Sequence, residues 1–90
     1  RASAPELELA PDDMPLFEAL RQMRAQLARE QGVPAYVIFH DSTLREIAAR
    51  RPASETELAG VGGIGAGKLE RYGEEGLETV RLHGQGDPVA

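Results

Sequence analysis

The sequence contains no cysteine, no long hydrophobic run and no excess of positive charge. Without cysteine, neither a disulfide nor a thiolate metal site can form, and a reducing interior such as the cytoplasm is the expected setting. No window approaches the roughly 18 consecutive apolar residues of a transmembrane helix, and we expect no signal segment at the start of the chain. The net charge is −5, which argues against strong nucleic-acid binding because that function normally requires a basic footprint.

The acidic charge is concentrated at the two ends of the 90-residue chain. Residues 1–13 carry −3 and residues 84–90 carry −1, so that residues 14–83 are close to neutral. We expect residues 1–13 to form an acidic linker or N-terminal extension, 14–83 a single folded domain and 84–90 a flexible tail. In the first part, Leu7 and Leu9 either belong to a solvated tether or dock on a neighbouring surface.

Apolar residues recur at helical spacing at the start of the domain. The stripe of the first helix consists of Leu16, Leu20, Met23 and Leu27. We expect Asp12 or Asp13 to cap this helix, Pro15 to lie in its first turn, and Gly32 and Pro34 to end it. The next segment, AYVIF (35–39), is rich in β-formers but has no partner strand, and we expect it to form a short buried helical turn.

Capping signals predict further helices. Asp41 is expected to cap a helix that stops at Pro52, and Ser54 with Glu57 forms the capping-box pattern S-x-x-E at the start of a short helix. The side chains expected to point inward are Leu44, Ile47 and Ala48 in the first of these helices, and Leu69, Tyr72, Leu77 and Val80 in a last helix whose regularity Gly73 and Gly76 break. The whole pattern predicts an all-α fold, a compact bundle of about five short helices.

The run GVGGIGAGKL, residues 60–69, matches both G-x-G-x-x-G and the first seven positions of the P-loop. Both nucleotide-binding patterns require a preceding strand, whereas residues 54–58 are predicted to be helical, and the P-loop needs Ser or Thr where Leu69 stands. We therefore expect no nucleotide and no cofactor. The run instead predicts a turn between two helices, in which Gly60 ends the first helix in the left-handed conformation and Ile64 packs into the core.

This turn resembles a helix-hairpin-helix element, with Gly63 and Gly65 on either side of Ile64. Backbone amides exposed at the start of the following helix would hold one phosphate without reading base sequence, and Lys68 would add a positive charge nearby. The alternative is a tight turn with a purely structural role.

Three segments follow one another along the chain: LFEALRQMRAQLA from Leu16, VPAYVIFHDSTLREIAARRP from Val33 and LAGVGGIGAGKLERYG from Leu58. Their order resembles the HRDC domain (helicase and RNase D C-terminal), in the version attached to RecQ-type DNA helicases, over residues 16 to about 82. The resemblance implies an accessory domain that binds single-stranded or branched DNA and directs the helicase to its substrates. The motor and its ATP site would lie elsewhere in the parent protein, and RNase D is the second possible host.

The resemblance also nominates nucleic-acid-binding residues. Tyr36 matches an aromatic position that some relatives use against single-stranded DNA, where base stacking contributes roughly 1–3 kcal/mol; the alternative is a tyrosine packed in the bundle with only its hydroxyl exposed. The complete candidate set is Tyr36, Lys68, Arg71, Gly63, Gly65 and Arg24. Arg24 is expected on the outer side or flank of the first helix, together with Arg21 and Arg29. Solvated surface charge is the alternative for all these cations.

The chain departs from the basic pattern of DNA-binding relatives on its last helix. Glu74, Glu75 and Glu78 follow the hairpin, and three carboxylates there would repel a nucleic-acid strand. They support an alternative function, in which an acidic interaction module docks on the parent helicase or on a partner and regulates its DNA binding.

No set of residues indicates catalysis by the domain itself. His40 and His83 are separated and lie in no ligand-spaced motif, and His40 is interpreted as a turn residue. Ser42 and Thr43 have no base and orienting partner beside them in the sequence. We expect no catalytic residue, no metal and no membrane contact, but a bacterial, nucleoid-associated protein whose partners are DNA and other domains of the parent helicase.

Overall fold

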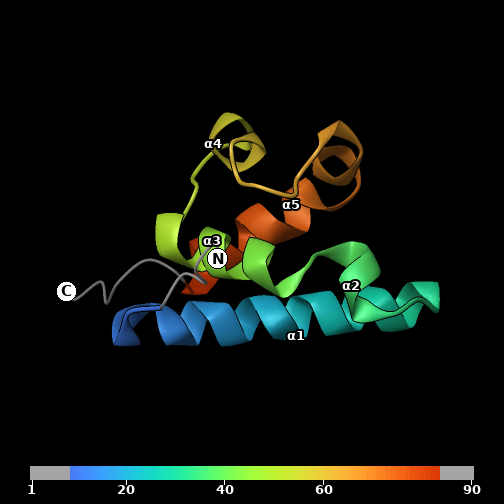
Figure 1. The fold of residues 1–90 in the computed structure, drawn as a ribbon, viewed down its shortest axis with the longest axis horizontal. Coiled ribbons are helices and arrows are strands. Elements are labelled where there is room, and N and C mark those ends of the chain that lie inside the picture. Colours follow the sequence, from blue (N-terminus) through green and yellow to red (C-terminus); the bar gives the residue numbers. More distant parts are fainter. Residues whose placement is uncertain (1–8, 84–90) are drawn as a thin grey trace, which may run out of the picture.

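The structure, a computed structural model, describes residues 9–83. Its elements in chain order are η1 (Pro11–Asp13), α1 (Met14–Gln31), α2 (Ala35–Ile38), α3 (Asp41–Arg50), α4 (Glu55–Ala59) and α5 (Ala66–His83). All regular structure within the described range is helical, so the predicted all-α bundle is confirmed (Figure 1). The predicted tail, and the predicted linker up to residue 8, lie outside that range.

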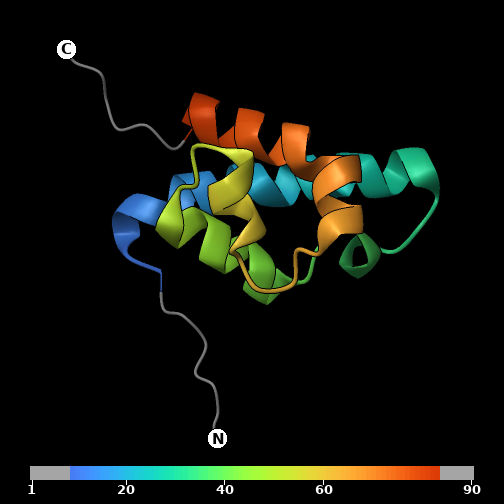
Figure 2. The ribbon, with the colours of Figure 1, turned by 90° about the horizontal axis from the view of Figure 1, so that it is seen from above.

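Helix α1 forms the base on which the other helices pack. Figures 1 and 2 show α1 running the length of the molecule beneath α3 and α5, with α4 on the far side of these two helices. The largest fully buried side chains come from α1 to α4 and are Leu16, Leu20, Ile38, Phe39, Leu44, Ile47 and Leu58. No helix in residues 9–83 is long and apolar enough to cross a membrane.

Both ends of α1 show how the chain enters and leaves this base. Leu9 packs partly against the core, which favours docking over a solvated tether for that leucine. Asp13 occupies the N-cap position but makes no capping hydrogen bond, so the predicted cap is wrong. Its carboxylate instead lies 2.8 Å from Arg51 at the end of α3. As predicted, Pro15 lies in the first turn, and Gly32 ends the helix with φ +69°.

Helix α2 confirms the predicted helical turn, although only its last part is buried. Ile38 and the following Phe39 are fully buried, whereas Tyr36 and Val37 are exposed. The prediction that Asp41 caps the next helix is wrong, because Asp41 is the first residue of α3 and His40 holds the N-cap position. The predicted inward residues of α3, Leu44, Ile47 and Ala48, are all buried.

The α4–α5 turn confirms its predicted cap but not its predicted glycine. Ser54 Oγ accepts a hydrogen bond from the Glu57 amide at 3.2 Å. Gly60 is right-handed, with φ −80°, so the prediction of a left-handed Gly60 is wrong. The left-handed residue is Gly63, with φ +89°, where an added Cβ would overlap Thr43 Oγ1 of α3. Ile64 is buried as predicted.

The glycines of α5 permit close packing and do not end the helix. Gly73 and Gly76 are both buried within the continuous helix Ala66–His83. A Cβ added at either position would contact Leu58 Cδ2, at 3.8 Å and 3.9 Å. Helix α5 changes direction between its orange first part and its red last part (Figure 2), as helices commonly do at glycine pairs. The absence of side chains at these positions lets α4 approach the bend.

Candidate nucleic-acid interface

The side chain of Tyr36 lies on the surface of α2. It is 60% exposed, so the alternative of a tyrosine packed in the bundle does not hold. Tyr72 shows what a packed tyrosine looks like in this fold: it is 5% exposed, and its hydroxyl donates a hydrogen bond to Gln31 Oε1 at 2.9 Å. A ring as open as that of Tyr36 is free to stack against a planar group.

A second ring, that of His40, lies beside Tyr36. The two ring centroids are 6.1 Å apart, with 22° between the ring planes, and His40 is exposed. We had interpreted His40 only as a turn residue. The spacing of four residues across a short helix could have indicated the pair, but only the helical conformation of residues 35–38 brings the rings together.

Arg24 holds the backbone beneath these rings and is not part of the exposed surface. It is 9% exposed, so the expected position on the outer side of α1 is wrong. Its Nη1 donates to the Phe39 carbonyl at 2.9 Å and to Asp41 Oδ1 at 2.8 Å. The hydrogen bond from Arg24 lowers the pKa of the Asp41 carboxyl below its ordinary value. Arg24 therefore connects α1 to the junction of α2 and α3.

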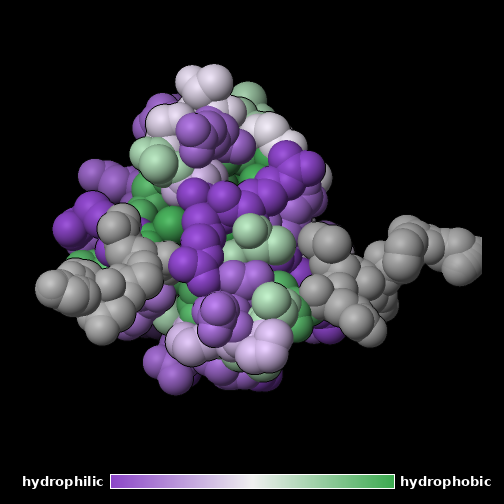
Figure 3. Space-filling model, turned by 90° about the vertical axis from the view of Figure 1, so that its left-hand side faces the viewer, coloured by the Kyte–Doolittle hydropathy of each residue, from purple (hydrophilic) through white to green (hydrophobic). Residues whose placement is uncertain are grey.

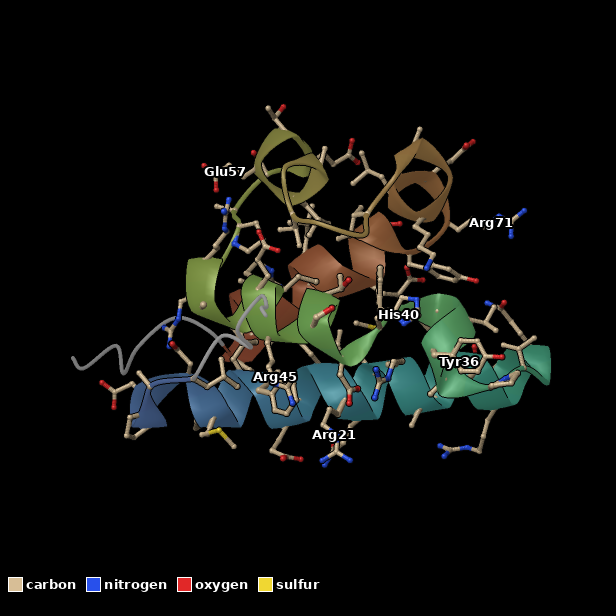
Figure 4. All side chains as sticks on the ribbon, in the orientation of Figure 1. Arg21, Tyr36, His40, Arg45, Glu57 and Arg71 are labelled. Carbon is tan, nitrogen blue, oxygen red and sulfur yellow. The ribbon has the colours of Figure 1, made fainter. Side chains whose placement is uncertain are left out.

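Lys68 and Arg71 lie on the first turns of α5 and face the same end of the molecule as Tyr36. Lys68 Nζ is 6.0 Å from the centre of the Phe39 ring. Phe39 follows Tyr36 by three residues in the chain. Arg71 is exposed, and Figure 4 draws it at the same end as Tyr36 and His40. We call Tyr36, His40, Lys68 and Arg71 the Tyr36 surface.

The other arginines of α1 lie outside the Tyr36 surface or add little to it. Arg21 extends from the opposite side of α1 in Figure 4 and pairs with Glu18 at 3.3 Å. Arg29 is exposed near the end of α1. Within residues 9–83, neither makes a hydrogen bond or an ion pair with α2 or α5.

The hairpin glycines have structural partners in α3. The Gly62 amide donates to Glu46 Oε1 at 3.1 Å, and Thr43 Oγ1 donates to the Gly62 carbonyl at 3.0 Å. Position 63 requires glycine because its backbone is left-handed and an added Cβ would overlap Thr43 Oγ1. The Gly65 carbonyl accepts the first hydrogen bond of α5, from the Leu69 amide. A carboxylate thus lies against the hairpin where the sequence suggested a phosphate, and we did not foresee Glu46, which is 16 residues from Gly62 in the chain.

A groove with an apolar floor and an acidic edge runs along the other side of α5. It has a volume of about 870 Å³. Its apolar lining includes Pro52, Leu69, Leu77 and Val80, and its acidic lining consists of Glu55, Glu70, Glu74 and Glu78. We call these residues the acidic groove. Glu75 lies outside it, beside Met23 and Gln26 of α1.

The surface of the α1 N-terminal end, drawn in Figure 3, is mostly hydrophilic, with small hydrophobic areas recessed between polar ridges. Within residues 9–83, no three His, Asp or Glu side chains are grouped so that they could hold a metal ion. The Tyr36 surface, with its rings and cations, and the acidic groove are two chemically distinct surfaces of residues 9–83.

The comparisons with known proteins agree on one family. The family model of the HRDC domain matches residues 13–80. The ATP-dependent DNA helicase RecQ of Bacillus subtilis is 40% identical over 68 residues, which are 76% of this chain and 12% of that protein. RecQ of Pasteurella multocida is 36% identical over 75 residues, or 83% of this chain and 12% of that protein. The ATP-dependent DNA helicase UvrD2 of Mycobacterium tuberculosis is 46% identical over 69 residues, or 77% of this chain and 10% of that protein.

Two solved structures share the fold. The HRDC domain 3 of D. radiodurans RecQ is 41% identical, with a TM-score of 0.76, and the match covers 78% of this chain and 92% of that one. The HRDC1 domain of RecQ helicase from Deinococcus radiodurans is 53% identical, with a TM-score of 0.55, covering 78% of this chain and 93% of that one. The chain therefore spans nearly all of these isolated domains but only about a tenth of the curated relatives it matches.

Proposed function

The chain belongs to the HRDC domain family, and from that premise we propose that it is an accessory domain of a bacterial RecQ-type DNA helicase that contributes weak binding of single-stranded or branched DNA. An HRDC domain is a small accessory part of a helicase and is not catalytic by itself. The motor activity, its ATP site and a location at the nucleoid belong to the proposed parent protein.

The exposed ring of Tyr36 is the observation that carries the proposal. A tyrosine that is 60% exposed leaves apolar ring surface in water, and stacking of an unpaired base would cover it. Lys68 and Arg71 supply positive charge at the same end. Stacking accepts any base, so we expect little sequence preference.

The affinity should be low because few cations accompany the ring. The Tyr36 surface has two permanently charged side chains, Lys68 and Arg71, while Arg24 is engaged beneath it. Each phosphate contact contributes through counterion release, so two cations provide a small electrostatic contribution. Glu46 at the hairpin further disfavours a phosphate beside Gly62.

The test is a titration of fluorescently labelled oligothymidine with the domain at low salt, followed by anisotropy. Tyr36→Ala should weaken binding about 5- to 150-fold, the equivalent of roughly 1–3 kcal/mol of stacking, whereas Tyr36→Phe should bind nearly as well as the natural domain. Val37→Ala is the matched control, because Val37 is also exposed on α2 but has no ring. Absence of binding at about 100 μM domain, within the usual range of non-specific affinities, or binding indifferent to Tyr36→Ala would refute the proposal.

The host is proposed as RecQ-type, with one competitor. RecQ and UvrD2 relatives both carry the domain, and both are named as DNA helicases. The two solved neighbours come from RecQ proteins, which favours that host over UvrD2 and over an RNase D-like exonuclease. Sequencing the adjoining coding region would decide among the three, since each motor has its own conserved motifs.

A second candidate function is supported by the exposed carboxylates of α5. Glu74, Glu75 and Glu78 are all exposed, and we propose as the alternative that this acidic side docks on the parent helicase or a partner and regulates DNA binding. Comparing the DNA affinity of the parent enzyme with and without the domain separates the two functions. Tighter binding on deletion supports regulation, and weaker binding supports a DNA-binding accessory role.

A further inference from the structure

The floor of the acidic groove presents apolar atoms to a space large enough for several side chains. Leu69 and Leu77 of α5 are half-buried, so that part of each side chain remains uncovered, and Pro52 closes the floor from the α3–α4 loop. The volume of about 870 Å³ falls in the range of binding sites for organic groups, roughly 300–1,000 Å³.

The edge of the groove carries a row of carboxylates. Glu70, Glu74 and Glu78 are spaced by four residues along α5, and all three line the groove. Glu55 of α4 faces the groove from the other wall. Two cations also line it, but Arg51 pairs with Asp13 and Arg81 with Glu78, so that the excess of negative charge at the edge comes from Glu55, Glu70 and Glu74.

This combination selects the chemistry of an occupant. A nucleic-acid strand is excluded because its phosphates would meet the carboxylate row. We propose that the acidic groove binds a short basic, amphipathic helical segment of a partner protein, whose apolar side chains cover Leu69 and Leu77 while its Lys or Arg residues pair with Glu55, Glu70 and Glu74.

The inference rests on the second function proposed above and is independent of DNA binding. It goes further by naming the groove, in place of the whole acidic side, as the docking site. Glu75 provides the distinction, because it adjoins Glu74 in the chain but lies outside the groove, beside Met23 and Gln26. Docking by diffuse charge would use both Glu70 and Glu75, whereas docking in the groove would use Glu70 and not Glu75.

The probe is an acetylated and amidated peptide of about twelve residues in which leucines and lysines recur at helical spacing. It is titrated into the isotope-labelled chain, and backbone amide shifts are followed by NMR. We expect the shifts to centre on Leu69, Leu77 and the α3–α4 loop. A peptide with Glu in place of Lys and another with Ser in place of Leu should each fail to produce them.

Two charge reversals decide whether the groove is the site. Glu70→Lys and Glu75→Lys change the net charge equally, and both positions are exposed, so both variants should fold, which circular dichroism verifies. Glu70→Lys should weaken peptide binding about fivefold or more, and Glu75→Lys by less than about twofold.

The following results would overturn the inference. One is a set of shifts that avoids the groove. Another is the absence of shifts at about 1 mM peptide, a concentration far above the dissociation constant expected of a helix-in-groove complex. A third is an equal effect of the two charge reversals. Concentration-dependent shifts at the groove without peptide would also do so, since they would identify a second copy of the chain as the occupant. In each case the deletion experiment on the parent helicase still tests the docking function separately.

Discussion

The Tyr36 surface and the acidic groove both use α5, but they present opposite charges. Lys68 lies over the Phe39 ring and Arg71 lies at the same end of the molecule as Tyr36 (Figure 4), whereas Glu70, Glu74 and Glu78 line the groove. Because successive helical residues are rotated by about 100°, a cationic and an acidic row can coexist on one helix. The near-neutral net charge of residues 14–83 therefore conceals two separated surfaces of opposite sign.

The two surfaces also differ in how their side chains are held. Under the Tyr36 surface, buried Arg24 joins α1 to Phe39 and Asp41, so the rings sit on a short helix with a fixed base. The groove lies between α5 and the segment from Arg51 to Glu55, and its edge carries exposed carboxylates. A ring with a fixed base suits stacking, and exposed carboxylates suit charge pairing with a partner.

The largest expected effect is on stability and comes from a substitution in the α4–α5 hairpin, which contacts α3. Gly63→Ala places a methyl group against Thr43 Oγ1 at a left-handed position, and we expect a loss of about 2 kcal/mol or more in the free energy of unfolding. Urea denaturation of the natural and substituted chains measures it.

Gly67→Ala is the matched control for this change. Gly67 lies in the first turn of α5, has no positive φ, and an added Cβ would meet nothing within 4 Å. The same methyl group should therefore be neutral or stabilise the chain by up to about 1 kcal/mol. If the two substitutions had equal effects, the contact between the hairpin and α3 would not matter for stability.

An intermediate effect is expected from acid, and only beneath the Tyr36 surface. The folded-state pKa of Asp41 is lowered, mainly by the hydrogen bond from Arg24, so the pair stabilises the fold above the ordinary pKa of 3.8. This contribution is lost as the pH falls below that value and through the lowered pKa. Asp41→Asn should thus flatten the fall in stability below about pH 4 and cost less than about 1 kcal/mol at neutral pH, because the carboxylate is largely exposed.

Denaturation midpoints at several pH values would measure this difference. Ser42→Asn provides the control, since it introduces the same side chain at the next exposed position of α3 and removes no carboxylate. If the acid dependence of stability were unchanged in Asp41→Asn, the charge of Asp41 in its pair with Arg24 would not contribute to stability.

The smallest expected effect is on the salt dependence of DNA binding. Replacing Lys68 or Arg71 by Gln should each reduce the slope of log K against log salt by about 0.7, the value for one phosphate contact on a single strand. Arg50→Gln is the control, because Arg50 pairs with Glu46 on α3. If neither α5 substitution changed the slope, Lys68 and Arg71 would make no phosphate contact, and DNA binding would depend on stacking by Tyr36.

Features determined by neighbouring residues were predicted well from the sequence. The first stripe, the Ser54–Glu57 cap, the helical turn at residues 35–38 and the burial of Ile64 were all confirmed. Each depends on spacing or hydrogen bonding within about four residues, where helical geometry relates position in the chain directly to position in space.

Features that depend on a distant partner were not predicted. Asp13 and Asp41 both looked like caps, yet each binds an arginine, 38 and 17 residues away. Sequence alone does not distinguish a capping carboxylate from an ion-paired one, because both lie at the start of a helix. In the same way, the left-handed residue of the hairpin was assigned to Gly60, since the contact of Gly63 with Thr43 joins separate helices.

The sequence by itself determined the helices, their order, the family and the row of carboxylates on the last helix, because helix formation and side-chain rows arise from local spacing. Only the tertiary structure decided which polar and aromatic side chains face solvent. It exposed Tyr36, buried Arg24, placed His40 on Tyr36, and formed a groove between α5 and the start of α4. Exposure depends on which helix packs over a side chain, and that packing joins residues far apart in the chain.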